Sequence, residues 1–213
     1  MSLLFPTQNL CYMCKEKSYY INNYICGECK ERLVYMHKEV GIGSQYISKT
    51  YYSVFYNRFI KELVHSFKFN DKSYLYKPLA EIMLETIDLI GIKKDIDLIF
   101  YVPIHRRKEA IRGYNQSELL AKYISGNINT PLSRNNLTKH KWTKEQNQLR
   151  KLERQNNLKD SFKIKNPNEI INKRILLIDD IITTGATFDE CGEVLKNNGA
   201  REVVGLALTS SKI

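Results

Sequence analysis

The sequence has no apolar run approaching the ~20 residues that an α-helix needs to cross a bilayer, so we expect no membrane insertion. The first residues lack the basic segment and the apolar core of a secretory signal, which favours a cytoplasmic protein. Internal repeats and low-complexity tracts are absent as well. The composition that remains is globular, because 43% of the 213 residues are hydrophobic and 11% are aromatic. This length predicts one domain, or one domain with a small added module.

The chain has a formal net charge of +10, which suggests an anionic partner such as nucleic acid, an acidic membrane surface or a phosphorylated metabolite. The positive charge is unevenly distributed along the sequence. Residues 134–174 hold 12 Lys and Arg against 4 Asp and Glu, whereas residues 175–213 hold 3 against 6. The largest share of the surplus therefore lies in one polar segment.

Four of the five cysteines form two Cys-x-x-Cys pairs, Cys11 with Cys14 and Cys26 with Cys29. Two such turns can present four thiolates to one tetrahedral zinc ion. The alternatives are two disulfides, which a secretion signal would accompany, or a redox motif, which needs no duplication. Four protein ligands leave no open position for a catalytic water, so we expect structural zinc in a module over residues 1–45. Cys191 shares a helical face with apolar residues and is expected to be a small buried hydrophobe.

Hydrophobic periodicity predicts alternating strands and helices after a Gly-containing linker at residues 41–44. We expect helices near residues 58–67, 76–90, 116–125 and 187–198, and strands near residues 51–56, 97–102, 174–178 and 202–209. This alternation is typical of an α/β fold with a mostly parallel sheet flanked by helices, here over residues 46–213.

The most informative segment is a strand, Ile175–Ile178, followed by Asp179, Asp180 and a small, hydroxyl-rich turn, Thr183–Thr187, that enters a helix. Such a turn directs backbone N–H groups and the positive end of the helix dipole toward one phosphate group. Adjacent carboxylates suit vicinal hydroxyls, which donate hydrogen bonds to them. The pattern therefore indicates a ribose 5-phosphate site, the alternative being an ordinary strand–turn–helix with solvated acids.

A second basic segment, residues 102–116, also follows a strand and contains Arg106, Arg107 and Arg112. Arginines suit polyphosphate oxygens because they make bidentate contacts. We expect this segment to be a loop beside the ribose site. The alternative is a solvated surface turn.

Residues 175–187 resemble the PRPP signature of type I phosphoribosyltransferases. With the paired cysteines, the Arg-Gly-Tyr-Asn-Gln run from Arg112 and a Thr-x-x-Gln segment, nearly the whole chain resembles the ComF family of competence-associated phosphoribosyltransferase-like proteins. The resemblance implies that Asp179 and Asp180 are catalytic, facing the ribose 2- and 3-hydroxyls of PRPP bound with Mg²⁺. It assigns the 5-phosphate to Thr183, Thr184, Gly185, Ala186 and Thr187. It assigns the pyrophosphate to Arg106, Arg107, Arg112, Gly113 and Asn115.

Residues of about 134–160 are expected to form a lid over the bound substrate. Thr143 to Gln146 has the form of a capping box, and the helix that follows it has only two apolar residues, so it buries little. Type I phosphoribosyltransferases close a flexible loop here, which excludes water from the reacting centre. The lid residues are Lys139, Lys141, Thr143, Gln146 and Arg154. Trp142, the single tryptophan, either stacks on a base or anchors this loop.

Two functional hypotheses follow. In the first, the protein binds Mg²⁺–PRPP and transfers its phosphoribosyl group to an amine or ring nitrogen, in support of natural competence and DNA uptake. In the second, it is a non-catalytic PRPP sensor or a single-stranded-DNA-handling adaptor beside a competence helicase. The resemblance also allows a homodimer. The positions of the positive charge favour PRPP over DNA as the anionic partner.

Overall fold

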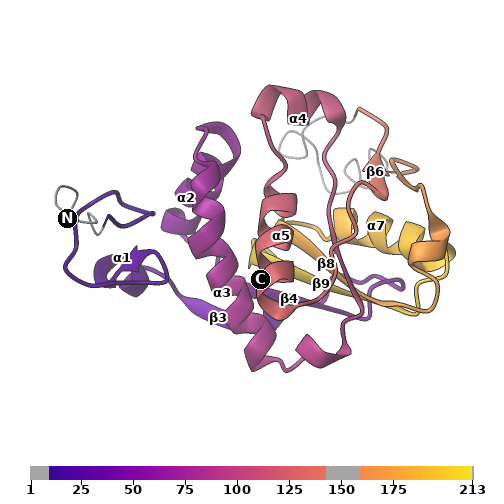
Figure 1. Ribbon diagram of the computed structural model, residues 1–213, viewed down its shortest axis with the longest axis horizontal. Helices are drawn as coiled ribbons and strands as arrows, with labels where there is room; N and C mark the ends of the chain where they lie inside the picture. The colour runs from indigo at the N-terminus through magenta and orange to yellow at the C-terminus, as the bar shows by residue number, and fades with distance from the viewer. Residues whose placement is uncertain (1–9, 143–158, 213) are drawn as a thin grey trace, which may run out of the picture.

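The computed structural model describes residues 10–142 and 159–212, and a five-stranded sheet forms its centre (Figure 1). The order of the strands in this sheet is β3-β4-β9-β8-β5. Their bounds are β3, Tyr35–Glu39; β4, Lys49–Phe55; β5, Leu98–Tyr101; β8, Arg174–Ile182; and β9, Glu202–Ser210. Strands β4, β9, β8 and β5 are parallel, and β3 pairs antiparallel with β4 at the edge. The expected α/β fold with a mostly parallel sheet is confirmed.

Helices cover both faces of the sheet. Helices α3 (Tyr76–Leu89) and α5 (Gln116–Ile128) pack on one face, and α7 (Ala186–Asn197) packs on the other. The alternation of side chains along β8 explains this layering. Leu176 and Ile178 belong to the apolar core under α3 and α5, whereas Ile175 and Leu177 belong to the core under α7. This strand is therefore buried on both faces, as its unbroken apolar run predicts.

The remaining helices lie beside these layers. Helix α2 (Arg58–Phe69) begins at Asn57, whose side chain accepts a hydrogen bond from the backbone N–H of Ile60 at 2.9 Å, as an N-cap does. Helix α4 (Arg106–Arg112) lies at the top of the molecule in Figure 1. The helices and strands expected from periodicity are thus present, with bounds shifted by a few residues.

Three features differ from the sequence-based expectation. The basic segment after β5 is not an open loop, because Arg106–Arg112 form α4. Strand β8 does not end at Ile178 but continues through both aspartates to Ile182, paired with β9. Strand β3, which lies just before the predicted linker in the sequence, was not expected. It pairs with β4.

The N-terminal module contains a two-stranded ribbon, β1 (Ile21–Asn22) and β2 (Ile25–Cys26), and a short helix, α1 (Gly27–Glu31). The module packs against the helical layer on the left in Figure 1. Two contacts fix it there: the hydroxyl groups of Tyr24 and Tyr123 lie 3.2 Å apart, and the Lys15 ammonium lies 3.4 Å from the centre of the Tyr74 ring. So few hydrogen-bonded residues cannot stabilise such a module alone, which leaves a role for a bound metal.

An antiparallel ribbon joins the two ends of the segment that was expected to be a lid. It consists of β6 (Leu137–Lys139) and β7 (Phe162–Ile164). The Asn136 side chain ties its base, because its carbonyl oxygen accepts hydrogen bonds from the backbone N–H groups of Lys165 at 3.0 Å and Asn166 at 2.7 Å. In residues 10–142 and 159–212, no helix has the length and apolar character needed to span a bilayer.

Candidate functional site

A cavity of about 410 Å³ opens where β8 extends beyond β5. The last β8–β5 pair joins Ile178 to Tyr101, so the residues that follow Ile178 stand free of β5. In open α/β sheets this point, beyond the carboxyl ends of the strands, is where ligands bind. The cavity is lined by the end of β8, the first turn of α7, α4, the end of α2 and the β6–β7 ribbon.

Two adjacent carboxylates form the floor of this cavity. The Ser117 hydroxyl donates a hydrogen bond to Asp179 Oδ1 at 2.7 Å, and the backbone N–H of Asp180 donates to the same oxygen at 2.9 Å. The ammonium of Lys68 lies 2.5 Å from Asp180 Oδ2, and Asp180 is 4% exposed. Burial raises the pKa of Asp179 to about 7 and the negative charge of Asp180 adds to the rise, while Lys68 and the Ser117 hydrogen bond oppose it.

The turn after β8 leads into α7 through a position that favours glycine. Gly185 has a φ of +87°, which a side chain rarely adopts, and a Cβ atom there would stand 2.5 Å from Cβ of Ile42. The Thr184 hydroxyl accepts a hydrogen bond from the backbone N–H of Ala186 at 3.3 Å. Thr183 and Thr187 line the cavity. The N-terminus of α7, with the positive end of its helix dipole, therefore lies at this opening.

Helix α4 forms the basic wall of the cavity. His105 caps the helix by accepting the backbone N–H of Arg107 at 3.2 Å, and His105, Lys108 and Arg112 line the cavity. Arg106 and Arg107 are exposed and do not line it. The helical geometry is the reason, because it turns successive side chains about 100° apart instead of presenting all of them to one point.

Two other residues of the expected pyrophosphate set have local structural roles. Gly113 ends α4 with a φ of +81°. Asn115 is 3% exposed and caps α5: its amide donates to the carbonyl of Val102 at 3.1 Å, and its oxygen accepts the N–H of Ser117 at 3.0 Å. Neither Gly113 nor Asn115 lines the cavity. Asn115 instead orients Ser117, which in turn contacts Asp179.

The β6 side of the cavity contributes a lysine and a tryptophan. Burial, with a smaller contribution from the nearby Lys108, lowers the pKa of Lys139 to about 8. Trp142 is 55% exposed, and its ring lies 5.2 Å from that of His105 in an edge-to-face arrangement. Lys141 does not line the cavity, since its ammonium bonds the carbonyl of Lys159 at 3.0 Å. The other expected lid residues, Thr143, Gln146 and Arg154, lie outside the described residues.

Sequence reasoning missed several residues that the structure places at this cavity, among them the polar residues Lys68, Ser117 and Lys108. Lys108 belongs to the basic segment after β5, so the same cluster of positive charge could have identified it. Lys68 is a polar residue in the last turn of an amphipathic helix, and nothing local distinguishes it from a solvated lysine. Ser117 follows the N-cap of α5, where a serine is ordinary. Only the tertiary fold brings Lys68 and Ser117 to the aspartates.

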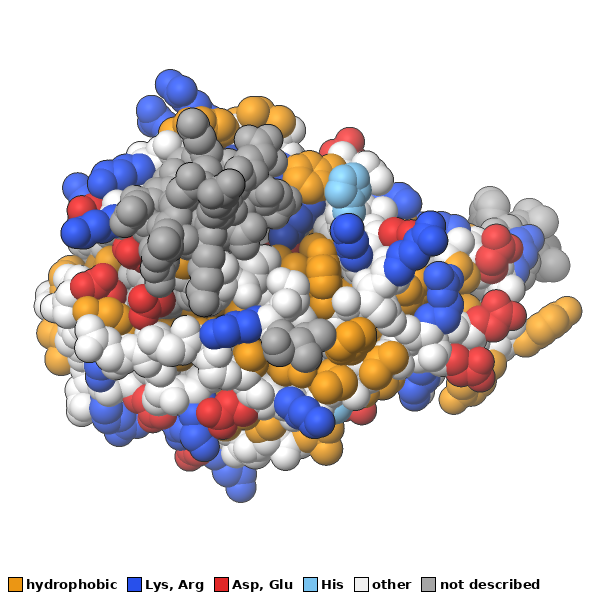
Figure 2. Space-filling model, turned by 180° about the vertical axis from the view of Figure 1, so that it is seen from behind, with side chains coloured by type: hydrophobic (Ala, Val, Ile, Leu, Met, Phe, Trp, Pro, Cys, Tyr) orange, Lys and Arg blue, Asp and Glu red, His pale blue; other side chains and the backbone are white. Residues whose placement is uncertain are grey.

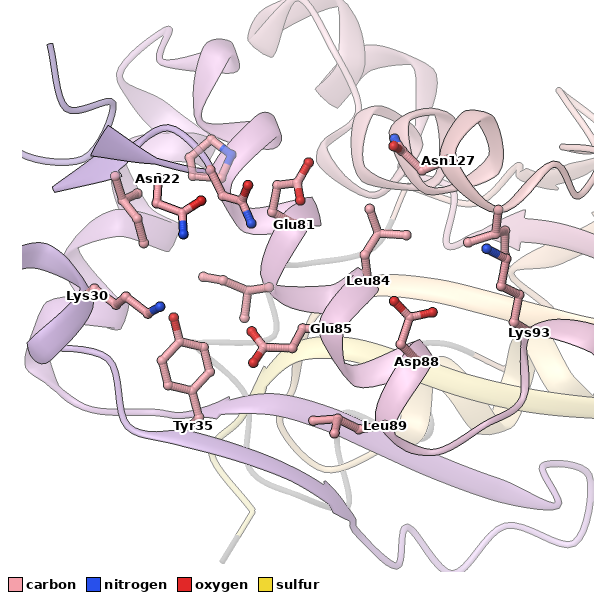
Figure 3. A pocket seen from close by; sticks show the side chains of 15 residues that line it. Asn22, Lys30, Tyr35, Glu81, Leu84, Glu85, Asp88, Leu89, Lys93 and Asn127 are labelled. Carbon is pink, nitrogen blue, oxygen red and sulfur yellow. The ribbon is translucent and has the colours of Figure 1, made fainter. Parts of the chain in front are cut away.

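A second cavity, of about 470 Å³, lies between the N-terminal module and α3 (Figure 3). Its α3 wall carries Glu81, Glu85 and Asp88, and Lys30 and Tyr35 face them from the module side. The Tyr123 hydroxyl donates a hydrogen bond to Glu81 at 2.5 Å. Three carboxylates on one wall make this cavity unfavourable for a phosphorylated ligand, so the first cavity is the better candidate for a phosphate site.

The four cysteines of the two pairs come together as the sequence predicts. Their sulfur atoms all lie within 4.8 Å of one another, and the Sγ atoms of Cys14 and Cys26 are 3.8 Å apart. A tetrahedral zinc ion ~2.3 Å from each sulfur would place the sulfurs about 3.8 Å apart. The backbone N–H of Cys26 also donates to Cys11 Sγ at 3.4 Å, a contact typical of metal-binding thiolates. The cluster could therefore bind a metal such as zinc.

A mostly parallel sheet, with two adjacent acids near the carboxyl end of β8 and a tight turn from that strand into a helix, is typical of a phosphoribosyltransferase-type domain. Residues 119–212 match the sequence family described as the phosphoribosyl transferase domain. Competence protein ComFC of Bacillus subtilis (strain 168) is 30% identical over 206 residues, which cover 92% of this chain and 82% of that protein. Competence protein F of Haemophilus influenzae is 29% identical over 192 residues, 88% of this chain and 78% of that protein. The chain belongs to the ComF family of competence proteins.

Two further similarities are more distant. DNA utilization protein YhgH of Escherichia coli (strain K12) is 28% identical over 149 residues, which cover 68% of this chain and 64% of that protein. The solved structure of orotate phosphoribosyltransferase from Aeropyrum pernix is 15% identical, covers 85% of this chain and 76% of its own, and has a TM-score of 0.37. A likeness that low adds no argument beyond the topology already described.

Proposed function

We propose that the cavity at the end of β8 binds Mg²⁺–PRPP and that the protein transfers the phosphoribosyl group to a nitrogen acceptor in the cytoplasm, in support of DNA uptake. One observation carries this proposal. Asp179, Asp180, Thr183 and Thr187 line a single cavity, at the N-terminus of α7. Hydrogen-bond acceptors suited to a diol and donors suited to a phosphate therefore lie a few residues apart, which supports a ribose 5-phosphate site.

Each group of residues has a distinct role in the proposed reaction. The turn at Thr183–Thr187 holds the 5-phosphate, and Asp179 and Asp180 face the ribose hydroxyls. Lys108 and Arg112 neutralise the pyrophosphate, which leaves with the electron pair of its bond to ribose C1. The acceptor nitrogen forms the new bond to C1 and loses a proton to solvent. Positive charge that develops on the ribose ring is stabilised by the two carboxylates.

The donor set at the floor of the cavity suits the proposed metal. Mg²⁺ prefers oxygen ligands and is usually bound through one or two carboxylates together with substrate phosphates, and the cavity offers two carboxylates. When bound, the ion supplies neutralisation of the pyrophosphate charge. We also propose that the four-cysteine cluster holds zinc in a structural role, since all four ligands come from the protein.

Titration calorimetry with Mg²⁺–PRPP tests the site directly. Wild type should bind, whereas Asp180→Asn should bind at least about tenfold more weakly, because a charged hydrogen-bond acceptor is lost. Asp88→Asn is the matched control, since it removes the same charge from an exposed position on α3, and it should bind like wild type. Unchanged affinity in Asp180→Asn would reject the assignment of the site. Release of pyrophosphate with a panel of bases, amines and single-stranded DNA then tests turnover and identifies the acceptor.

The second candidate function is a PRPP-sensing or single-stranded-DNA-handling adaptor that works beside a competence helicase. The names of the relatives, which refer to competence and DNA utilization, favour it, as does the exposed Trp142 beside a basic wall. Figure 2 weighs against a dedicated nucleic-acid surface on the face it shows, because Lys and Arg side chains lie there in separate groups among acidic ones. DNA affinity that falls steeply with salt would support this candidate, and a flat response would reject it.

A further inference from the structure

The floor of the cavity contains an internal ion pair that connects two separate layers of the fold. Lys68 belongs to the last turn of α2, whereas Asp180 belongs to β8 in the central sheet. Their charged atoms lie 2.5 Å apart, with the side chains 22% and 6% exposed. Both residues line the cavity, so the pair lies on the surface that a ligand must contact.

The neighbouring structure holds Lys68 in this position. The carbonyl oxygen of Phe67, the residue before it, accepts hydrogen bonds from the Tyr114 hydroxyl at 2.5 Å and from the Gln116 amide at 3.3 Å. Phe67 itself is fully buried. The end of α2 is therefore hydrogen-bonded to the junction of α4 and α5. These bonds fix the backbone next to Lys68, whose side chain extends to Asp180.

The ammonium of Lys68 takes the place that a cation would occupy beside the carboxylates. Two adjacent carboxylates repel each other and attract a positive ion, and their oxygens are the ligands that divalent magnesium and manganese prefer. Lys68 supplies one positive charge at one of these oxygens. A free divalent ion must displace this ammonium before it can contact Asp180 Oδ2, and it meets the positive charge of Lys68 on approach to either carboxylate.

We propose that Lys68 is a built-in counter-cation that excludes free divalent metal ions from the cavity. It releases Asp180 only when the metal arrives chelated by a polyphosphate, whose oxygens accept hydrogen bonds from the displaced ammonium. The identity of that polyphosphate as PRPP rests on the proposed function. The exclusion of free metal does not, because it follows from the ion pair alone. Lys68 is thus a positioning residue that makes metal and donor substrate enter together.

Binding of Mn²⁺ in the absence of PRPP, followed by the electron paramagnetic resonance signal of the free ion, tests this role. The full chain is used, with its cysteine cluster intact. Lys68→Met and Lys68→Gln should bind Mn²⁺ at least about tenfold more tightly than wild type, because the competing charge at Asp180 is gone. Lys68→Arg should behave like wild type, since it keeps the charge. Lys61→Met, an exposed lysine on the same helix, is the matched control and should show no gain.

A second arm locates the new metal site. In Lys68→Met with Asp180→Asn the gain should vanish, and a gain that persists would place the ion elsewhere and overturn the proposal. No gain in either neutral Lys68 variant, with the melting temperature unchanged, would overturn it too. Calorimetry with PRPP on the same proteins separates the two proposals. If no protein binds PRPP while the neutral variants gain Mn²⁺, the proposed function fails and the counter-cation role stands.

Discussion

Replacing Asp179 with Asn should stabilise the protein at alkaline pH, although the residue lies at the centre of the candidate site. In the folded protein the pKa of this carboxyl is raised from 3.8 to about 7, first by burial and then by Asp180. Asparagine keeps an oxygen in the same place, so the hydrogen bonds from Ser117 and from the N–H of Asp180 are retained. Only the unfavourable charge is removed.

The direction and size of the effect follow from linkage. A raised pKa means that the folded state binds the proton more tightly than the unfolded state does. The resulting stability is fully present below pH 3.8 and is lost as the pH rises to about 7. At about 1.4 kcal/mol per pKa unit the loss has an upper limit of about 4 kcal/mol. Since the Asp179 side chain is partly exposed, we expect Asp179→Asn to gain about 2 kcal/mol of unfolding free energy at pH 8 and less than half of that at pH 5.

Urea unfolding followed by circular dichroism at pH 5 and pH 8 measures this difference. Asp88→Asn, an exposed acid on α3, should change stability equally at the two pH values. The reasoning is refuted if Asp179→Asn is destabilised at pH 8, or if its gain is as large at pH 5. The same variant should bind Mg²⁺–PRPP more weakly, so that stability and affinity change in opposite directions. This trade-off is common where a binding site retains a charge that destabilises the folded protein.

Three further outcomes are expected. Cys29→Ser should lower the metal content from about one zinc ion per chain to a small fraction, measured by elemental analysis, and should lower the melting temperature because the module loses a ligand. Gly205→Ala should destabilise the protein by about 1–3 kcal/mol in urea unfolding, since its Cβ would stand 2.8 Å from the ring of Phe188. Lys139 loses its charge near pH 8, so PRPP affinity measured by calorimetry should fall above that pH. Lys139→Arg should shift this fall to a higher pH.

The parts of the fold that depend on local pattern could be predicted from the sequence. Three features are each determined by residues only a few positions apart: the apolar run of β8, the N-cap at Asn57 and the two cysteine pairs. The same holds for the candidate site, because the aspartates and the turn into α7 are consecutive. Their common cavity follows from one strand–turn–helix unit.

The rest depends on contacts between distant residues or on weak local signals. Helix α4 has no apolar face, since its seven residues are mostly charged, and periodicity therefore gave no helix there. The assignment of Arg106 and Arg107 to the pyrophosphate assumed an open loop, in which all side chains could turn to one point. Lys68 reaches Asp180 across 112 positions of sequence, and no spacing rule joins them. These residues become part of the site only through packing.

Strand β3 has a consequence for how the protein can be divided. The backbone N–H of Phe55 donates to the carbonyl of Val34 and that of Val40 to the carbonyl of Thr50, so the residues just before position 46 are hydrogen-bonded to the sheet. A chain shortened to begin at residue 46 would keep the phosphoribosyltransferase signature but leave one side of β4 unpaired. Unpaired strand edges associate with one another, so such a fragment should form oligomers or precipitate. The smallest well-behaved fragment of this domain must begin before β3.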